Sequence, residues 1–424
     1  MTVGYQQLIK VIEFWRERIH PDGLQDRDIV GAVDLKSREV IDLVGPRRSG
    51  KSSVLKLIVK RLGLKDNYLF INFADPIFIT NNDPAVIEEL IQVFREYFNP
   101  KLEYLFFDEI QDITHWERAI RKLRDGDKFK IFLTGSSSKL LSGELSTLLT
   151  GRHQSYRILP LSFQEFIAFR GVVLAGKRDL VLKEKTLLKH FDEYLSIGGF
   201  PEIVLTNNRE LLKSYFFDIV QKDVVMRYDV REKEVLQKMA VYLMSNAAKI
   251  ASVETLKNTF SISFALASSY IEYLKEAFLI FDLQQFSYSL KTQHKALKKI
   301  YSIDTGLSNA VSFKFSEDIG RALENVVFLE LLKRGNEIYY YMTAGNLEVD
   351  FLIKQGLKME GLIQVSWNLE DKKTRQREMR ALSQSMEETN INHATILTYN
   401  EEETAEIKGR VIQIMPVWKW LLSA

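Results

Sequence analysis

The sequence contains no cysteine among its 424 residues, which rules out disulfide bonds and thiolate metal ligands. This absence fits a reducing compartment or selection against thermolabile residues. Histidine is also scarce, and the six histidines lack the paired spacing of a zinc site. No segment approaches the run of about 20 apolar residues that a membrane helix needs. We therefore expect a cytoplasmic protein without membrane contact.

An excess of charge of either sign is missing as well, because 58 basic and 56 acidic residues leave a net charge of +2. No global field would recruit nucleic acid, so any DNA-binding surface must be local. The length suggests about three domains. A hydrophobic content of 46% suffices for several buried cores. Composition neither supports nor excludes DNA as a partner.

The most informative segment that is present is GPRRSGKSS at Gly45–Ser53, which fits the pattern G-x-x-x-x-G-K-[ST]. Residues 39–44 before it predict a strand, and residues 51–58 predict the start of a helix. The backbone N–H groups of such a loop bind phosphate oxygens, so the segment predicts a nucleoside triphosphate site. An ordinary glycine turn is the alternative. The residues expected to line the site are Gly45, Pro46, Arg47, Arg48, Ser49, Gly50, Lys51, Ser52 and Ser53.

Two acidic residues end the next informative strand and give the loop a chemical context. Lys51 would reach the β and γ phosphates, and Ser52 would ligate Mg²⁺. The apolar segment 102–107 ends in Asp108 and Glu109. Asp108 would hold Mg²⁺ through water, and Glu109 would orient and polarise the attacking water. This pair predicts a hydrolase rather than a simple nucleotide binder.

A third strand, predicted at 128–133, leads into hydroxyl side chains at Thr134 and Ser136. We take Ser136 as the candidate sensor of the γ-phosphate. Each of these strand ends could instead be a solvated turn, but their order along the chain favours one nucleotide site. The strands expected in this region are 39–44, 68–73, 103–108, 129–134 and 155–159, alternating with helices near 51–62, 84–98 and 115–123. Such alternation predicts a parallel sheet covered on both faces.

Long helical patterns follow residue 161, with an interruption at Gly198–Glu202, and predict a helical lid or connector. The expected helices are 162–169, 183–195 and 209–228. A helix-turn-helix pattern comes next, with helices at 252–260 and 264–280, and segments 281–286 and 299–303 could pair as a wing. The basic stretch between them offers Lys291, Lys295, Lys298 and Lys299 as candidate DNA contacts. A solvated surface loop is the equally open alternative.

Taken together, the sequence resembles a bacterial and archaeal family of AAA+ ATPases in which a P-loop domain and a winged helix precede a nuclease-like domain of the PD-(D/E)xK class. Besides the motifs above, the resemblance rests on Gly151-Arg152, Leu159–Phe163, Gly198–Glu202, Ile303–Leu307, Gly320–Asn325 and Glu348–Phe351. It implies an α/β fold with a parallel P-loop sheet, a helical lid with the winged helix, and a C-terminal restriction-endonuclease-like domain. The expected boundaries are 1–30 for an N-terminal helix, 31–165, 166–304 and 305–424.

The same resemblance implies ATP and Mg²⁺ as cofactors and neighbouring subunits that complete each other's sites in a homo-oligomer. Arg152 resembles an arginine finger, which would stabilise charge on the γ-phosphate. A helix cap or a surface ion pair is the alternative role for Arg152.

The nuclease-like part matches its class incompletely. Such a site needs an Asp and a following Glu-x-Lys on adjacent strands, and an earlier helical Glu often assists them. Glu324 and Asp350 match, but Gln364 and Ser366 stand where Glu and Lys are expected. Gln lacks the charge that holds a divalent cation, and Ser lacks the ammonium that activates water. We predict inefficient DNA cleavage and a fold retained to bind DNA or a partner; Lys358 or Glu360 acting from a shifted position is the alternative.

The expected function is therefore a Mg²⁺-dependent ATPase that acts on DNA, with branched or processed DNA as a candidate substrate. Two alternatives stay open. One is a slow nucleotide-dependent switch that works through a protein partner of unknown identity, and the other is an active metal-dependent DNA nuclease.

Overall fold

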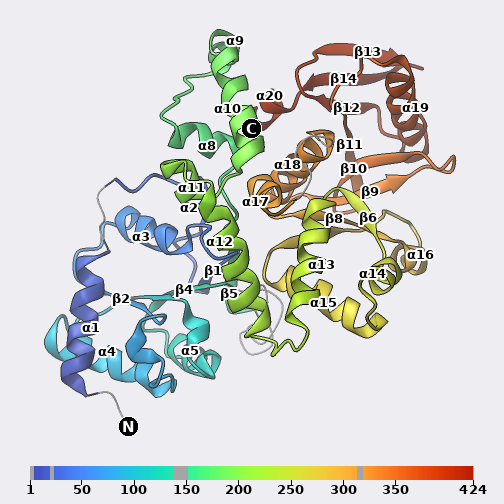
Figure 1. Ribbon diagram of the computed structural model, residues 1–424. Helices are drawn as coiled ribbons and strands as arrows, with labels where there is room; N and C mark the ends of the chain where they lie inside the picture. The colour runs from blue at the N-terminus through green and yellow to red at the C-terminus, as the bar shows by residue number, and fades with distance from the viewer. Residues whose placement is uncertain (1–3, 20–22, 137–150, 313–318, 424) are drawn as a thin grey trace. The chain divides into compact units, whose positions relative to one another are not determined.

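The computed structural model describes residues 4–19, 23–136, 151–312 and 319–423. It divides into two compact units, Met1–Leu159 and Pro160–Ala424. Figure 1 shows the first unit in blue to cyan and the second in green to red. Within the described ranges, no helix combines the length and apolarity needed to cross a bilayer.

The first unit is built on a five-stranded sheet in which all neighbouring strands are parallel. Its strands are β1 Val40–Val44, β2 Tyr68–Asn72, β3 Tyr104–Asp108, β4 Lys130–Gly135 and β5 His153–Arg157, in the order β2-β3-β4-β1-β5. Every residue of β1 is buried, as expected for a strand covered on both faces. The predicted parallel sheet is confirmed, although β5 begins two residues earlier than expected.

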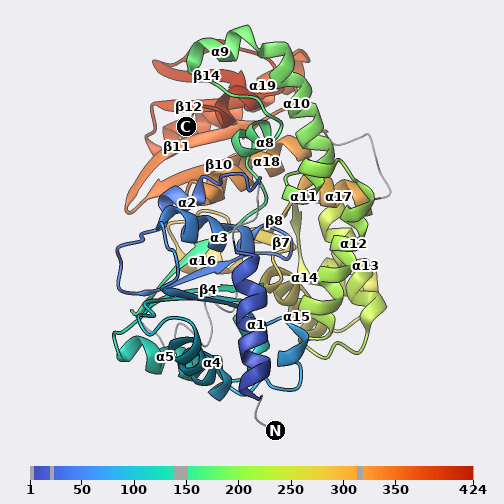
Figure 2. The same cartoon turned by 90° about the vertical axis from the view of Figure 1, so that its left-hand side faces the viewer.

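Helices lie on both sides of this sheet, with α3 on one side and α4 and α5 on the other (Figures 1 and 2). The helices of the unit are α1 Tyr5–Glu17, α2 Ile29–Ala32, α3 Lys51–Arg61, α4 Ala85–Tyr97 and α5 Trp116–Asp125. Leu8, Val11 and Ile12 form the buried stripe of α1, and Trp15 Nε1 donates a hydrogen bond to Asp75 Oδ2 at 3.2 Å. The predicted N-terminal helix therefore packs on the sheet domain.

The second unit opens with helices. They are α8 Phe163–Phe169, α9 Lys177–Leu182, α10 Glu184–Ile197, α11 Pro201–Thr206, α12 Glu210–Asp218, a π-helical segment Ile219–Val225, and α13 Lys233–Ser245. The start of α8 is fixed by a capping box in which Ser162 and Glu165 each bind the other's backbone N–H. The helix predicted across 209–228 is thus an α-helix that passes into π turns.

A winged helix-turn-helix follows, as the sequence predicts. Its elements are β6 Lys249–Ala251, α14 Val253–Phe260, α15 Phe264–Glu276, β7 Ile280–Leu283, α16 Leu290–Lys295 and β8 Lys298–Ser302, and the strands form an antiparallel sheet in the order β6-β8-β7. Several predicted bounds are wrong, since the first helix begins at Val253 and the two wing strands are Ile280–Leu283 and Lys298–Ser302. The second helix ends at Glu276 because Phe278 adopts a left-handed backbone with φ of 59°, and Ile280 already belongs to β7. The basic stretch forms helix α16 and part of β8 rather than a loop.

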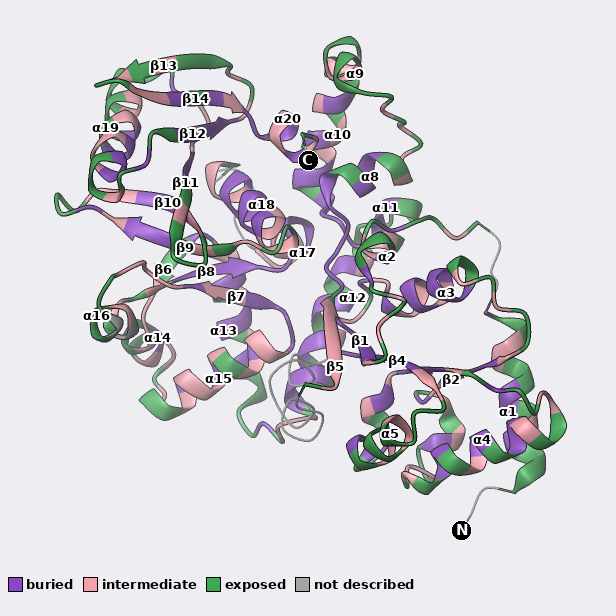
Figure 3. Ribbon diagram, turned by 180° about the vertical axis from the view of Figure 1, so that it is seen from behind, coloured by how far each residue is buried: buried purple, intermediate pink, exposed green. Residues whose placement is uncertain are grey.

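The unit ends in a mixed six-stranded sheet. Its elements are α17 Thr305–Val311, α18 Ile319–Lys333, β9 Glu337–Met342, β10 Glu348–Gln355, β11 Lys358–Val365, α19 Lys372–Thr389, β12 His393–Thr398, β13 Glu403–Ile407, β14 Arg410–Pro416 and α20 Val417–Leu421. The strand order is β13-β14-β12-β11-β10-β9, with parallel pairs at β11/β12 and β12/β14. Leu382 and Met386 of α19 enter the core beneath the sheet. In Figure 3 the strands β10, β11 and β12 each contain a buried stretch together with intermediate or exposed residues.

Two glycine-containing motifs meet at the junction between α10 and α17. Asp304 accepts hydrogen bonds from the backbone N–H groups of Gly199 and Leu307, each at 2.7 Å. A Cβ atom on Gly306 would lie 2.0 Å from the carbonyl oxygen of Ile197. The motifs Gly198–Glu202 and Ile303–Leu307 therefore serve close backbone packing in the helical part of this unit.

Gly306→Ala is expected to lower the free energy of unfolding by at least about 2 kcal/mol, because the new methyl group would overlap a fixed carbonyl group. Gly320→Ala is the matched control, since that helical glycine has open space around its Cβ position. Urea unfolding of both variants measures the difference. Equal stability of the two variants would contradict this account of the junction.

Candidate functional site

The loop between β1 and α3 has a backbone that glycine makes possible. A Cβ atom on Gly45 would lie 2.1 Å from the carbonyl oxygen of Ile158. Gly50, which caps α3, has φ of 96° in the left-handed region. Arg48 also has a positive φ, 69°, which is uncommon for a residue with a side chain. The loop is therefore held in a tight curl at the carboxyl end of β1.

Two polar side chains of this loop, those of Lys51 and Ser49, are buried. Lys51 is 4% exposed, and its Nζ donates to the carbonyl oxygens of Gly45 at 3.1 Å and Pro46 at 3.0 Å. The hydroxyl of Ser49 is buried, and no described residue forms a hydrogen bond with it. A buried hydroxyl without a partner beside an ammonium group fits an anionic ligand such as a phosphate chain.

Asp108 ends β3 beside this loop and is 1% exposed. Its Oδ2 accepts from Asn72 Nδ2 at 2.9 Å, its Oδ1 accepts from Thr134 Oγ1 at 2.5 Å, and the Ser52 hydroxyl also bonds to it. Burial, followed by the charge of Glu109, raises the pKa of Asp108 to about 6 against the opposing effect of these hydrogen bonds. The structure thus joins Ser52 and Asp108, the two predicted magnesium ligands.

Glu109 lies at the same edge of the sheet in a left-handed backbone conformation with φ of 52°. Its backbone N–H donates to Thr134 Oγ1 at 2.9 Å, and its Oε2 accepts from Gln111 Nε2 at 2.5 Å. Its Oε1 lies 4.0 Å from Lys51 Nζ. A non-glycine residue in this conformation stores strain that persists where the surroundings fix it, as at functional sites.

Three residues that position these carboxylates were not assigned that role from the sequence. Thr134 bonds to the side chain of Asp108 and to the backbone N–H of Glu109, whereas Ser136, the hydroxyl chosen from the sequence, is buried directly after β4. Asn72 and Gln111 were not singled out at all. Two of them could have been predicted from their position, because Asn72 and Thr134 are polar residues at the carboxyl ends of parallel strands, where ligands bind.

Arg152 precedes β5 and forms a surface ion pair. Its Nη1 lies 2.6 Å from Asp125 Oδ1, and its side chain is 40% exposed. This is one of the two roles considered from the sequence. The arginine-finger role concerns a neighbouring subunit and stays a prediction.

The nuclease-like residues of the second unit come together around β10 and β11. Gln364 Oε1 accepts from the backbone N–H of Asp350 at 3.2 Å, and Asp350 Oδ2 accepts from the N–H of Val365 at 2.9 Å. Glu324 of α18 reaches the same cluster through Lys299. Ser366 turns away and donates to the carbonyl oxygen of Asn368.

Lys299 occupies the centre of this cluster, which contradicts its predicted contact with DNA. Its Nζ lies 2.7 Å from Glu324, 2.7 Å from Glu348 and 3.0 Å from Asp350, and the residue is 2% exposed. Strand β8 directs this lysine into the protein, which sequence periodicity in a short basic run could not reveal. Lys298 is also engaged, since its Nζ lies 2.5 Å from Asp282 Oδ2.

The two other candidate lysines of the basic stretch, Lys291 and Lys295, are exposed.

The shifted alternative for the nuclease-like site is wrong in this structure. Lys358 and Glu360 pair with each other at 3.0 Å at the opposite end of β11, and the lysine side chain is 76% exposed. The ammonium group beside Asp350 comes from β8 instead. A further carboxylate, Glu378 of α19, accepts from Gln364 Nε2 at 2.7 Å.

These acidic residues do not fit a divalent metal ion in the observed arrangement. The ammonium group of Lys299 binds the three carboxylates that face the centre, and the described residues contain no group of His, Asp or Glu side chains arranged to hold a metal. Burial alone would lower the pKa of Lys299, but the surrounding acids, Asp350 first, hold it well above its ordinary value. Burial, followed by the charge of Asp350, raises the pKa of Glu324 to about 8.

Glu324→Gln is expected to flatten the pH dependence of stability. The pKa of Glu324 rises from 4.5 to about 8 on folding, so between these values the folded state binds the additional proton. The protonated Glu324 side chain therefore stabilises the folded state fully below the pKa of the unfolded chain, and this stabilisation is lost as the pH rises through the pKa of the folded state. Urea unfolding across this window should show a steeper decline for the wild type than for the variant. If the free energy of unfolding of the wild type and of Glu324→Gln changed with pH in parallel, the raised pKa of Glu324 would be contradicted.

Three family models match the chain along its length. An AAA domain matches residues 37–167, a domain of unknown function (DUF8612) matches 188–318, and a second domain of unknown function (DUF4143) matches 319–420. The first match contains the phosphate loop and both strand-end carboxylates.

Relatives are found in an archaeon and in a bacterium. "Uncharacterized protein MJ1544" of Methanocaldococcus jannaschii is 38% identical, with 94% of this chain and 91% of the relative covered. An "Uncharacterized protein" of Haemophilus influenzae is 29% identical, with 92% and 96% covered. A second M. jannaschii protein, MJ1637, is 24% identical over 76% of this chain and 74% of its own length.

Solved structures show a weaker likeness. The Aeropyrum pernix ORC1 protein, solved in complex with DNA, gives a TM-score of 0.30 at 12% identity, covering 70% of this chain and 95% of that one. The Thermotoga maritima RuvB branch migration motor gives 0.29 at 16% identity, covering 65% and 87%. Similarity at this level carries no conclusion about function.

Proposed function

The chain belongs to the same protein family as its 38%-identical archaeal relative and carries an AAA domain, and from this premise we propose that it is a Mg²⁺-dependent ATPase. One observation carries the proposal. Lys51 of the phosphate loop lies 4.0 Å from Glu109 and beside Asp108, so a phosphate-binding ammonium group and two strand-end carboxylates share one sheet edge. This combination supports hydrolysis as well as binding.

In the proposed reaction, the loop N–H groups bind the phosphates, and Lys51 exchanges its loop carbonyl partners for the terminal phosphates. Ser52 and Asp108 would hold Mg²⁺, which when bound supplies positive charge against the phosphate oxygens. Glu109 accepts the proton of the attacking water as a general base. Thr134 and Gln111 keep the Glu109 carboxylate in position, because they bond to its backbone and side chain respectively.

Lys51→Ala is expected to lower the rate of ATP hydrolysis at least about 100-fold, since it removes the charge that binds the transferred phosphoryl group. Lys60→Ala, at the exposed end of the same helix, is the control and should hydrolyse ATP at the wild-type rate. Phosphate release under saturating Mg²⁺ and ATP measures both. Hydrolysis by Lys51→Ala at the rate of the control would remove the assignment.

Thr134→Val should lower kcat by about 10- to 100-fold with a smaller change in KM, because the isosteric side chain loses the hydroxyl that aligns Asp108 and Glu109. Thr134→Ser keeps a hydroxyl and should retain most of the activity. Steady-state kinetics of the pair provides the test. Similar kcat values for the two variants would show that the hydroxyl has no part in positioning the carboxylates.

We further propose that the second unit acts on DNA, with its nuclease-like part serving binding rather than cleavage. The helix-turn-helix arrangement of α14 and α15 with the paired strands β7 and β8 supports a DNA-binding role by its architecture alone, since α15 carries a single basic residue, Lys275. The buried ammonium group of Lys299 supports inefficient cleavage, since it binds the acids that a metal would require. A homo-oligomer in which Arg152 serves a neighbouring site is part of the proposal.

A nucleotide-dependent switch acting through a protein partner is the second candidate. One observation favours it: the second helix of the winged motif, α15, ends with Glu272, Lys275 and Glu276, and so presents no basic face to a phosphate backbone. A DNA contact in this unit therefore requires a different basic surface.

A further inference from the structure

The segment before β1 reaches the phosphate loop through the side chain of Arg27, which is 6% exposed. Its Nη1 donates a hydrogen bond to the carbonyl oxygen of Ser49 at 3.0 Å, and its Nη2 donates to the carbonyl oxygen of Leu159 at 2.9 Å. Leu159 directly follows Ile158, whose carbonyl group packs on Gly45. One planar guanidinium therefore joins the second half of the loop to the chain that the first half contacts.

The short helix α2 fixes the position of Arg27. The backbone N–H of Val30 donates to the carbonyl oxygen of Arg27 at 3.1 Å, which ties the residue to the start of this helix. Val30 is buried in the same core as Leu55 and Ile58 of α3. Figures 1 and 2 show α2 beside α3. Because α3 starts at the phosphate loop, this packing keeps the guanidinium within reach of Ser49.

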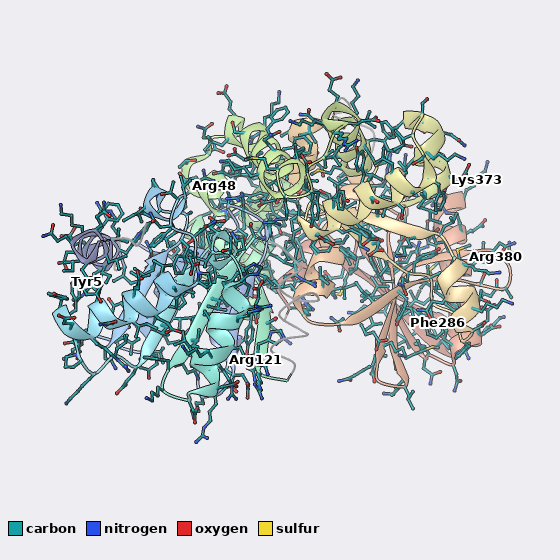
Figure 4. The ribbon with its side chains drawn as sticks, turned by 90° about the horizontal axis from the view of Figure 1, so that it is seen from below. Tyr5, Arg48, Arg121, Phe286, Lys373 and Arg380 are labelled. Carbon is teal, nitrogen blue, oxygen red and sulfur yellow. The ribbon has the colours of Figure 1, made fainter. Side chains whose placement is uncertain are left out.

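The hydrogen bond to Ser49 sets the direction of a backbone N–H group in the loop, which the label of Arg48 marks in Figure 4. In a planar trans peptide, the C=O of one residue and the N–H of the next point in opposite directions. Arg27 binds the Ser49 carbonyl and therefore turns the Gly50 N–H away from itself. Such N–H groups are what a phosphate loop presents to its ligand. Gly50 has no side chain to restrict this peptide, so the bond to Arg27 supplies the restriction.

Lys130 has a similar role at another place in the first unit. Its Nζ donates to the carbonyl oxygen of Leu35 at 2.6 Å and to that of Ser37. Neither carbonyl group belongs to the phosphate loop. Both cations thus brace the backbone, and of the two only Arg27 braces the loop. A comparison of the two residues separates an effect on the nucleotide site from an effect on stability.

We propose that Arg27 is a positioning residue of the nucleotide site, an inference that rests on the proposed binding of ATP at Gly45–Ser53. Both terminal nitrogen atoms of its guanidinium bind carbonyl groups, so it acts through the loop backbone rather than as a ligand of the phosphates. Without Arg27, the loop populates arrangements in which the Gly50 N–H points elsewhere, and only a fraction of the molecules can bind ATP. The apparent dissociation constant rises in inverse proportion to that fraction.

The test compares Arg27→Met with Lys130→Met, each of which replaces a carbonyl-binding cation by an uncharged, unbranched side chain. Isothermal titration calorimetry with ATP and Mg²⁺ measures the dissociation constant and the number of sites per chain. Arg27→Met should bind ATP at least about tenfold more weakly, with one site per chain retained. Lys130→Met should bind ATP within about threefold of the wild type, since its partners lie outside the loop.

Steady-state kinetics of ATP hydrolysis adds a second readout. The KM of Arg27→Met should rise with the dissociation constant, while kcat stays within about threefold of the wild type. Saturating ATP holds the loop in its competent arrangement, and Lys51 and Glu109 are unchanged. A fall in kcat at unchanged KM would contradict the proposal, because it would place the effect of Arg27 on the chemical step.

Arg27→Lys separates geometry from charge. It keeps the positive charge but has one nitrogen atom in place of the fork that binds two carbonyl groups. Its affinity for ATP should be at least about threefold below that of the wild type. Wild-type affinity would assign the effect to charge alone and overturn the proposal. If circular dichroism shows that Arg27→Met is unfolded, Arg27→Lys alone decides by the same measurement.

Structural damage and loss of positioning give different results. Partial unfolding lowers the number of sites per chain, whereas a misdirected Gly50 N–H raises the dissociation constant at an unchanged number of sites. Equal losses of affinity in Arg27→Met and Lys130→Met would overturn the proposal. ATP binding by the wild type without hydrolysis would remove the proposed ATPase function, and the affinities of the variants would still decide the role of Arg27. Absence of ATP binding by the wild type would overturn both.

Discussion

The close approach of the phosphate loop to the chain at Ile158 is the constraint on which the first unit depends. Gly45 meets the Ile158 carbonyl where any side chain would collide, and this contact fixes the turn that opens α3. Because α3 begins at Lys51, the same turn sets the direction of the lysine and of Ser52. Parallel strands then deliver Asp108 to the same edge, so one backbone contact and one sheet topology assemble the site.

The second unit is held together by charge in a different way. Lys299 joins a strand of the winged motif to acids on α18 and β10, so one buried ammonium group links two parts of the unit. Removal of one partner from such a cluster leaves an uncompensated buried charge, which is strongly destabilising. The acids that resemble a nuclease site thus have a structural role in this chain.

Local patterns in the sequence predicted much of the fold. The phosphate loop, the alternation of strands and helices, and the paired strands of the wing depend on short-range periodicity and were confirmed. The predicted loop residues stay predictions about binding, although Ser52 and Asp108 do meet. Long-range contacts could not be predicted in the same way, because Lys299 and Asp350 are distant in sequence and no local period shows which face of β8 turns inward. Thr134 was overlooked for Ser136 because both are hydroxyls at one strand end, and the register of β4 decides between them.

The central claim is that the first unit binds a nucleoside triphosphate through the loop at Gly45–Ser53. Isothermal titration calorimetry of the wild-type protein with ATP, in the presence of Mg²⁺ and again after chelation with EDTA, tests it most directly. The account predicts one site per chain, with tighter binding when Mg²⁺ is present. Absence of ATP binding under both conditions would contradict it.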